Sequence, residues 1–371
     1  MAELKSPFRY DFVGSFLRPQ RLKEARAQFK AGEIDRAALT AVENEEITRL
    51  IEKQKRAGYH AITDGEFRRS YWHLDFMWGF EGIAHEKDGG GVQFNGEMAD
   101  LEATYLVGKV KAKVHPFVEY FKFLKQFEDE QTVAKYTIPA PAQMYQQMIV
   151  PQNIEQTRKF YATDEELIED IGKAYQDVIK QFYAAGCRNL QLDDCTWGAI
   201  VGDVAKQRYQ SLGVDIEEVK ARLLKVNNLA LENRPEDMVI TSHICRGNYH
   251  STFFTSGPYD SVADYVFAQE HVDALLLEYD DERSGGSAPL AKVSPDKKVV
   301  LGLITTKKPE LEDKDKVIAR IHEAAKYIPL ERLCLSPQCG FASCEIGNKL
   351  TEEQQWAKLA LVKEIAEEVW K

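Results

Sequence analysis

A histidine and a cysteine stand two positions apart, directly after an apolar run in the middle of the chain. His243 and Cys245 lie in the segment HICRGN, which follows MVITS. In an extended strand, residues i and i+2 point to the same side, so this imidazole and this thiol should converge on one point. Together they would supply half of a tetrahedral zinc site.

Two further ligand candidates stand where other apolar runs end. Glu278 follows ALLL, and Cys339 lies in LCLSPQCG. One imidazole, two thiolates and a carboxylate form a nitrogen, sulfur and oxygen set that suits Zn²⁺. The competing interpretation makes Cys339 a buried small hydrophobe and Glu278 a surface carboxylate. The four groups can meet only if their strands belong to one closed sheet.

Eight strand-like runs alternate with helical patterns along the chain. The runs occupy 10–15, 60–66, 135–141, 189–194, 238–245, 274–279, 298–305 and 332–337. Apolar residues recur at spacings of three and four over 38–57, 164–185, 214–232, 313–326 and 351–370. Alternating elements favour an α/β fold with a parallel sheet, and eight repeats favour a closed (β/α)8 TIM barrel over an open sheet.

Polar groups at the ends of other predicted strands strengthen this interpretation. Ser15, Glu66, Asp193 and Asp194 all stand where an apolar run stops. Catalytic residues of a barrel lie at its C-terminal mouth, where the carboxyl ends of the strands meet. We therefore expect these side chains to face the same opening as the four ligand candidates.

Composition limits the class of protein. A length of 371 residues fits either two average domains or one large α/β barrel over 1–371, and a composition that is 44% hydrophobic and 29% charged does not choose between them. A net charge of -11, from 48 basic and 59 acidic residues, argues against nucleic acid as a partner. The start has no signal-peptide pattern, and no window reaches the roughly 20 apolar residues of a membrane span. We expect a cytoplasmic protein with reduced cysteines and no membrane association.

Two stretches look like additions to the repeat. Segment 70–133, after the second strand, holds the aromatic cluster YWHLDFMWGF, the glycine-rich KDGGGVQFNGE and the sequence ATYLVGKVKAKV, which predicts a hairpin. The glycines lack the spacing of a dinucleotide-binding loop, so we interpret the insertion as a lid or hairpin. Segment 246–259 is predicted to be a loop that either lines the pocket or caps the barrel.

The ordered set DFVGSFLRP, ITDGEFRR, LQLDD, HICRGN, LLLEYDDERSG and LSPQCGFAS resembles the C-terminal catalytic barrel of cobalamin-independent methionine synthase. The resemblance runs from about residue 10 to the end. In that family, zinc held by His, Cys, Glu and Cys binds the thiol of homocysteine as a thiolate, and a methyl donor converts it to methionine. The resemblance implies that His243, Cys245, Glu278 and Cys339 are the zinc ligands.

The same resemblance implies how the amino acid is held. Glu66 and Asp193 match residues that bind homocysteine, and Ser15 matches one that contacts its carboxylate. The structural alternatives are an ion pair of Glu66 with Arg68 or Arg69, a turn-capping Ser15 and a buried, hydrogen-bonded Asp193.

Several departures concern the methyl donor. The family element IDEP reads LDDC here, with Asp194 and Cys195 at its end, and Tyr145 stands near the position of a tryptophan that stacks on the pterin. No histidine follows the seventh strand, where the family uses one to assist the leaving nitrogen; Lys307 stands close to that place and is our candidate catalytic residue. The N-terminal barrel of the full-length enzyme has no counterpart. The donor is a methyltetrahydrofolate or another methyl compound.

Two other functions fit the same residues. A related zinc-dependent alkyltransferase could act on a different thiol or electrophile, such as an epoxide opened by coenzyme M. Alternatively, the zinc could be structural in a barrel without catalytic activity. A structural zinc usually has ligands close together in sequence, whereas these ligands span 243 to 339.

Overall fold

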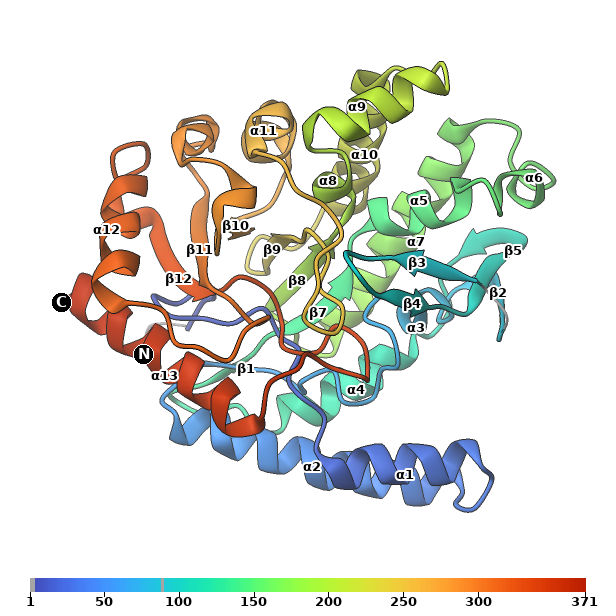
Figure 1. Ribbon diagram of the computed structural model, residues 1–371. Coiled ribbons are helices and arrows are strands. Elements are labelled where there is room, and N and C mark those ends of the chain that lie inside the picture. The colour runs from blue at the N-terminus through green and yellow to red at the C-terminus, as the bar shows by residue number, and fades with distance from the viewer. Residues whose placement is uncertain (1–3, 88–89) are drawn as a thin grey trace.

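Six parallel strands form one continuous sheet in the computed structural model, which describes residues 4–87 and 90–371. They follow one another in space as they do in sequence (Figure 1): β7 (Tyr136–Pro139), β8 (Asn189–Asp194), β9 (Val239–Ile244), β10 (Ala274–Glu278), β11 (Lys298–Ile304) and β12 (Leu333–Pro337). The register places His243 beside Asp193 on one side and Leu276 on the other. The predicted α/β fold with a parallel sheet is confirmed.

The N-terminal segment and β1 (Ala61–Ile62) lie between the two edges of this sheet. β1 pairs in parallel with β6 (Val133–Ala134), and Tyr10 forms a parallel bridge with Leu335 of β12. The backbone N–H of Phe16 donates to the carbonyl of Gly65 at 3.1 Å, which links the N-terminal segment to the end of β1. Segment 10–15 was expected to be a full strand, but only Tyr10 takes part in a β-bridge.

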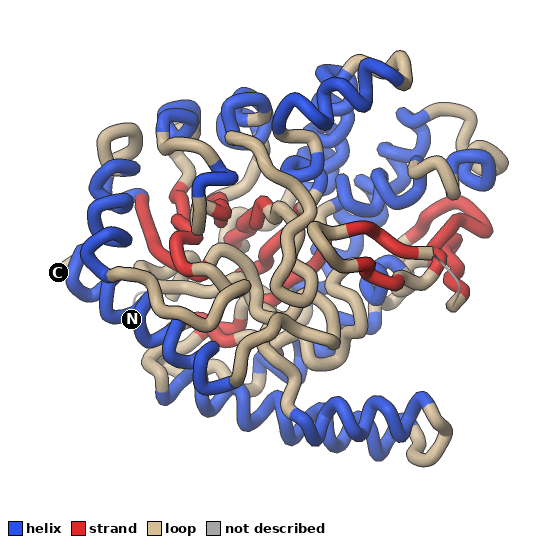
Figure 2. The backbone as a smooth tube through the Cα atoms, in the orientation of Figure 1, coloured by secondary structure: helices blue, strands red, loops and turns tan. Residues whose placement is uncertain are grey.

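Helices surround the strands (Figure 2). Five of them match the helical patterns of the sequence: α2 (Arg36–Arg56), α7 (Asp164–Ala184), α10 (Ile216–Leu231), α12 (Lys314–Ala324) and α13 (Glu352–Val369). Their starts follow from capping: the hydroxyl of Thr163 accepts from the N–H of Glu166, and Thr351 and Gln354 form a capping box. None of the described helices is long and apolar enough to cross a membrane.

The remaining helices were not picked out by the apolar spacing. They are α1 (Gln20–Lys30), α3 (Leu74–Met77), α4 (Pro116–Lys125), α5 (Pro141–Ile149), α6 (Ile154–Thr157), α8 (Thr196–Ala199), α9 (Gly202–Ser211) and α11 (Ala263–Gln269). Except for α1, which has 11 residues like α12, they are shorter than the five predicted helices and have fewer turns in which a 3.6-residue period can appear.

Segment 70–133 contains two antiparallel strand pairs. β2 (Glu81–Glu86) pairs with β5 (Ala103–Lys111), and β3 (Gly91–Gln93) pairs with β4 (Met98–Asp100). The hairpin predicted around ATYLVGKVKAKV takes a different form, because those residues mostly form the single strand β5, whose antiparallel partner is the earlier strand β2. In the predicted glycine-rich stretch, residues 88 and 89 lie outside the described part of the chain.

Neighbouring residues of the strands point to opposite faces, and this places the histidine. Leu275 and Leu277 belong to the main apolar core, whereas Leu276 clusters with Val13, Val300 and Cys334 on the other face. His243 pairs with Leu276 in the register and therefore points to that same inner side.

Candidate metal centre and the pocket beside it

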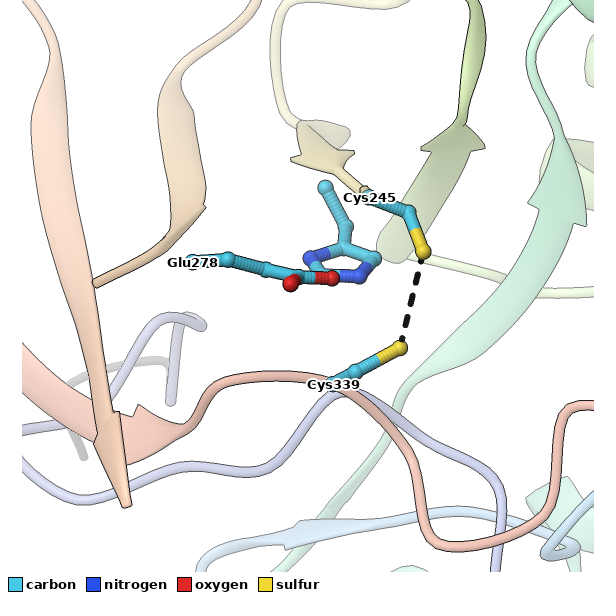
Figure 3. A group of neighbouring side chains, drawn as sticks. Cys245, Glu278 and Cys339 are labelled. Atoms are coloured by element: carbon cyan, nitrogen blue, oxygen red, sulfur yellow. Dashed lines mark hydrogen bonds between the residues drawn. The ribbon is translucent and has the colours of Figure 1, made fainter. Parts of the chain in front are cut away.

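Three strands bring the four ligand candidates together. His243 and Cys245 come from the end of β9, Glu278 is the last residue of β10, and Cys339 follows β12 by two residues. One donor atom from each lies within 4.8 Å of the donor atoms of the other three, and all four residues are buried. Figure 3 shows the two sulfur atoms facing one another and the Glu278 carboxylate directed to the same space.

The spacing of the two sulfur atoms fits zinc. Cys245 Sγ lies 3.7 Å from Cys339 Sγ. With Zn–S bonds of about 2.3 Å, tetrahedral geometry places two thiolate sulfurs about 3.8 Å apart. The sulfur of Cys245 also accepts from the N–H of Gly247 at 3.3 Å, which helps to hold it in place.

The histidine and the glutamate each present an unpaired buried atom to this space. Among the described residues, neither Nε2 of His243 nor Oε2 of Glu278 has a hydrogen-bond partner. The carbonyl of Leu276 lies 3.3 Å from Nδ1 of His243 and fixes the proton there, so Nε2 carries the lone pair. Burying such atoms unpaired is costly, and a bound cation would remove that cost. The residues present therefore fit Zn²⁺.

Protonation of the thiols agrees with a need for a cation. The hydrogen bond between Cys339 and Cys245, followed by burial, raises the pKa of Cys339 well above its ordinary value. The neighbouring Cys195 and burial likewise raise the pKa of Cys245, even though its contact with Cys339 acts in the opposite direction. Both groups would hold their protons until a metal replaced them.

Backbone and hydroxyl groups hold the Glu278 carboxylate from one side. Its Oε1 accepts from the N–H of Arg246 at 3.0 Å, and its own N–H donates to the Tyr259 hydroxyl at 3.0 Å. On the other side, Nζ of Lys307 lies 3.9 Å from Oε2. Burial opposes the charged form of Lys307, but the carboxylates of Glu278 and Asp280 hold its pKa above the ordinary value.

A pocket of about 220 Å³ adjoins the ligand group. Three of the four ligand candidates line it, all except Glu278, and so do the predicted substrate-binding residues Ser15, Glu66 and Asp193. Lys307 is not among its lining residues, although it touches the outer side of the ligand group. The structure thus brings together the ligands and the predicted amino-acid anchors around one cavity.

Glu66 is held under backbone strain with one oxygen free. Its φ of 61° lies in the left-handed region, which is uncommon for a residue with a side chain. Oε1 accepts from the hydroxyl of Thr137 at 2.9 Å and lies 3.5 Å from Nη1 of Arg69. Oε2 is buried without a partner in the described structure. The ion pair with Arg69 therefore coexists with a free acceptor.

Asp193 adds a second acidic group to the same wall. Its Oδ1 accepts from Nε2 of Gln191 at 2.7 Å. Burial, together with the negative charge of Glu66, raises the pKa of Asp193 well above its ordinary value. Two buried carboxyl groups that repel each other form a place where a cation such as an ammonium is favoured.

Ser15 contacts the loop after β12. Its hydroxyl accepts from the N–H of Ala342 at 3.3 Å, and a Cβ atom at Gly340 would come within 1.9 Å of Ser15 Oγ. Position 340 must therefore be glycine for this contact. The contact agrees with the interpretation that Ser15 caps a turn. Ser15 nevertheless also lines the pocket.

Other lining residues were not predicted from the sequence. Cys195 lines the pocket beside Cys245, and His73 is buried in the wall with Nδ1 unpaired among the residues described. Burial lowers the pKa of His73 to about 3, so the ring is neutral. Cys195 was judged to lack a partner with the right local spacing, and His73 stands in an aromatic run that indicated only packing. Tyr145 does not line the pocket; its hydroxyl donates to Asp164 at 3.0 Å.

The β3–β4 hairpin forms the outer wall together with loop 246–259. The N–H of Asn95 donates to the carbonyl of Phe253 at 3.0 Å, and the Phe94 ring lies 5.3 Å from that of Tyr249. At the edge, Oε2 of Glu97 lies 2.7 Å from Nδ1 of His250, and Lys349 contacts the same carboxylate. Of the two interpretations of loop 246–259, pocket lining is confirmed, since Tyr249 and Phe254 face the cavity.

Comparison with known proteins agrees with these observations. Residues 10–368 match the family model described as the catalytic domain of cobalamin-independent synthase. The uncharacterized protein YxjH of Bacillus subtilis is 45% identical over 99% of this chain and 96% of its own length. A methionine synthase of Saccharolobus solfataricus is 24% identical over 88% of this chain and 86% of its own.

A solved structure extends the likeness to three dimensions. It is described as a putative vitamin-B12 independent methionine synthase from Listeria monocytogenes, and it is 36% identical to this chain. The match covers all of both chains with a TM-score of 0.78.

Proposed function

Because this chain belongs to the family of cobalamin-independent synthase catalytic domains, we propose that it is a zinc-dependent methyltransferase that converts homocysteine to methionine. The observation that carries this proposal is the shared cavity, which is lined by Cys245 and Cys339 and also by Glu66 and Asp193. The first pair suits a metal that binds a thiol, and the second pair suits an ammonium group. Homocysteine carries both groups on one short chain.

His243, Cys245, Glu278 and Cys339 would hold the zinc. Bound zinc supplies Lewis acidity, which lowers the pKa of a coordinated thiol so that its sulfur is nucleophilic at neutral pH. Thiols are otherwise mostly protonated, since their pKa is about 8.5.

The protein would position the amino acid around this sulfur. The free Oε2 of Glu66 and the carboxyl group of Asp193 accept hydrogen bonds from the ammonium, while Ser15 is close enough to the pocket to contact the carboxylate. In the transfer step, a sulfur electron pair forms a bond to the methyl carbon as the bond to the donor breaks. The electron pair of that broken bond leaves with the donor atom.

The outer wall would hold the methyl donor. Phe94, Tyr249 and Phe254 supply aromatic faces there, and the buried His73 supplies a neutral ring nitrogen. The donor is a methyltetrahydrofolate or another methyl compound. Tyr145 would not stack on it, because its ring lies outside the pocket lining.

We also propose that residues 1–371 act as one barrel domain and that segment 70–133 serves as a lid. Support comes from the β3–β4 hairpin, which contributes Val92 and Phe94 to the cavity wall. A cytoplasmic location and the absence of nucleic acid and membrane partners stay predictions.

An alkyltransferase acting on another thiol is the second candidate. The departure at Tyr145 supports it, because it changes the surroundings of the donor and leaves the metal ligands intact. The paired carboxyl groups favour an ammonium-bearing thiol over a simple one. A purely structural zinc is disfavoured because three ligand residues line an open cavity.

The test is a titration of cobalt-substituted protein with homocysteine and, in parallel, with 1-propanethiol. We expect a sulfur-to-cobalt absorption band with homocysteine at a far lower concentration than with propanethiol. Methionine formation is then followed by mass spectrometry with methyltetrahydrofolate and other methyl compounds as donors. Equal affinity for both thiols would favour the second candidate, and no band with either thiol would contradict both.

A further inference from the structure

Lys307 forms a buried ion pair that is not closed. Its Nζ lies 3.9 Å from Oε2 of Glu278, beyond hydrogen-bond length, and the two side chains are 7% and 0% exposed. Within the described part of the chain, neither atom has a hydrogen-bond partner. A charged amine and a carboxylate oxygen thus face each other across a short gap.

The surroundings leave Lys307 available to Glu278. The nearby Asp280 already faces Arg283, with Oδ1 of Asp280 3.5 Å from Nη2 of Arg283. The residue before Lys307 is held by two hydrogen bonds: the hydroxyl of Thr306 donates to the carbonyl of Gly340 at 3.0 Å, and Nδ2 of Asn348 donates to the carbonyl of Thr306 at 2.8 Å. The amine is therefore presented from a fixed backbone.

Glu278 has one fixed oxygen and one free oxygen. Oε1 is held by the N–H of Arg246, whereas Oε2 has only the metal position on one side and Lys307 on the other. A small rotation of the carboxylate about the fixed oxygen would bring Oε2 to hydrogen-bond distance from Nζ. The carboxylate can thus exchange one cation for another without leaving its place.

The charge balance at the metal favours release of the Glu278 carboxylate when a substrate thiolate binds. Two thiolates and one carboxylate already exceed the charge of a divalent cation, and a substrate thiolate adds one more negative charge. A tetrahedral centre that accepts the new sulfur must release a ligand, and the carboxylate is the hard oxygen among softer donors. A released carboxylate left unpaired at this depth would be strongly destabilised.

We propose that Lys307 is a positioning residue that receives the Glu278 carboxylate when the substrate thiol replaces it at the metal. This inference rests on the proposed function, and it assigns the lysine a role through Glu278. Lys307 does not line the substrate pocket, so it would not contact the substrate. It would act on the equilibrium between two positions of the Glu278 carboxylate, one at the metal and one paired with the lysine.

The test measures thiol binding and metal binding, independently of turnover. Cobalt-substituted wild type, Lys307→Met and Lys307→Arg are titrated with homocysteine through the sulfur-to-cobalt band, and zinc affinity is measured by competition with a chelator. In Lys307→Met we expect homocysteine to bind about tenfold more weakly or worse, with zinc bound at least as tightly as in wild type. Lys307→Arg should keep most of the thiol affinity, and the exposed Lys308→Met is the matched control.

The same lysine substitution in a Glu278→Gln protein separates the proposed role of Lys307 from a general disturbance of the site. In a Glu278→Gln protein the side chain carries no charge, so adding Lys307→Met should leave thiol affinity unchanged. If the effect of Lys307→Met persists in that background, or is absent in wild type, the inference is overturned. If wild type itself gives no band with homocysteine, the proposed function fails and the role of Lys307 fails with it.

Discussion

Cys245 Sγ and Cys339 Sγ lie 3.7 Å apart, although 94 residues separate them in the sequence. This distance is far longer than the about 2.0 Å of a disulfide bond and matches two thiolates on one metal ion. Both are free cysteines. The contact between the two sulfur atoms joins the end of β9 to the loop after β12. It therefore depends on the arrangement of these strands in the sheet, and so does the metal site.

Removal of one sulfur should empty the metal site. We expect Cys339→Ser to lower zinc content from about one per chain to a small fraction of that value, since loss of a ligand sharply weakens a four-ligand site. Metal content is measured by mass spectrometry on protein purified under reducing conditions. Cys334→Ser, a buried cysteine within β12, is the matched control and should retain its zinc. Unchanged zinc in Cys339→Ser would rule out this ligand set.

Glu66 should select the amino-acid part of the substrate. In Glu66→Gln, the charge of Arg69, 3.5 Å from Oε1, is no longer balanced and would repel an ammonium. We expect homocysteine to bind about 10- to 100-fold more weakly, as for the loss of a charged hydrogen bond. Binding of 1-propanethiol and zinc content should stay as in wild type. An equal loss for both thiols would show that Glu66 acts on the fold and not on the ammonium.

Glu270 should make stability depend on pH. Burial, followed by the negative charge of Asp194, raises the pKa of this carboxyl group from 4.5 to about 8. The folded state then binds the proton more tightly than the unfolded state. The protonated Glu270 carboxyl group therefore adds to the free energy of unfolding. This stabilisation is complete below pH 4.5 and is lost as the pH rises to about 8.

Glu270→Gln tests that dependence. Its amide keeps the oxygen that accepts from Nδ2 of Asn227 at 3.1 Å and cannot ionise. Urea unfolding of metal-free protein at several pH values should show a flatter profile and higher stability of the variant near pH 8. The free energy of unfolding should change with pH less steeply in Glu270→Gln than in wild type between pH 5 and 8, the range that separates the two pKa values of Glu270. Equal slopes in the two proteins would contradict this prediction.

Glu97 should hold the β3–β4 hairpin over the pocket. Hydrogen bonds from Lys349 and His250 lower the pKa of Glu97, so it is ionised at neutral pH. Glu97→Gln should raise hydrogen exchange in residues 91–100 and raise the KM for the methyl donor, with unchanged zinc content. Added salt should have a similar effect on wild type, because the pairs are exposed. Glu86→Gln, at the other strand pair, should leave the exchange of residues 91–100 unaltered.

The strand-end residues could be predicted because their positions follow from two simple periodicities. Segment 189–194 was predicted with the bounds of β8, since Leu190 and Leu192 alternate with polar residues up to Asp193 and Asp194. The same logic placed His243, Cys245, Glu278 and Cys339, and the structure brings them together. Their roles remain proposals until the metal is measured.

The insertion could not be predicted in detail, because two of its glycines, Gly82 and Gly108, serve packing inside strands and not turns. Gly108 lies inside β5, opposite Gly82, which has a φ of 83°. A Cβ at Gly82 would lie 2.4 Å from the carbonyl oxygen of Lys109, so a bulge in β2 requires glycine there. A glycine in mid-strand and one in a hairpin turn look alike in sequence. Cys195 was missed because no ligand pair with the right local spacing was recognised there, and His73 because it stands in an aromatic run that indicates packing.

The order of the amino-acid anchors and the metal-ligand candidates along the chain has a consequence for biosynthesis. Glu66 and Asp193 come first, His243, Cys245 and Glu278 follow, and Cys339 comes near the end. A ribosome therefore completes the amino-acid anchor long before it adds the last sulfur. Until Cys339 is added, the nascent chain can offer no more than three of the four metal-ligand candidates, so the complete set exists only after residue 339 has been synthesised.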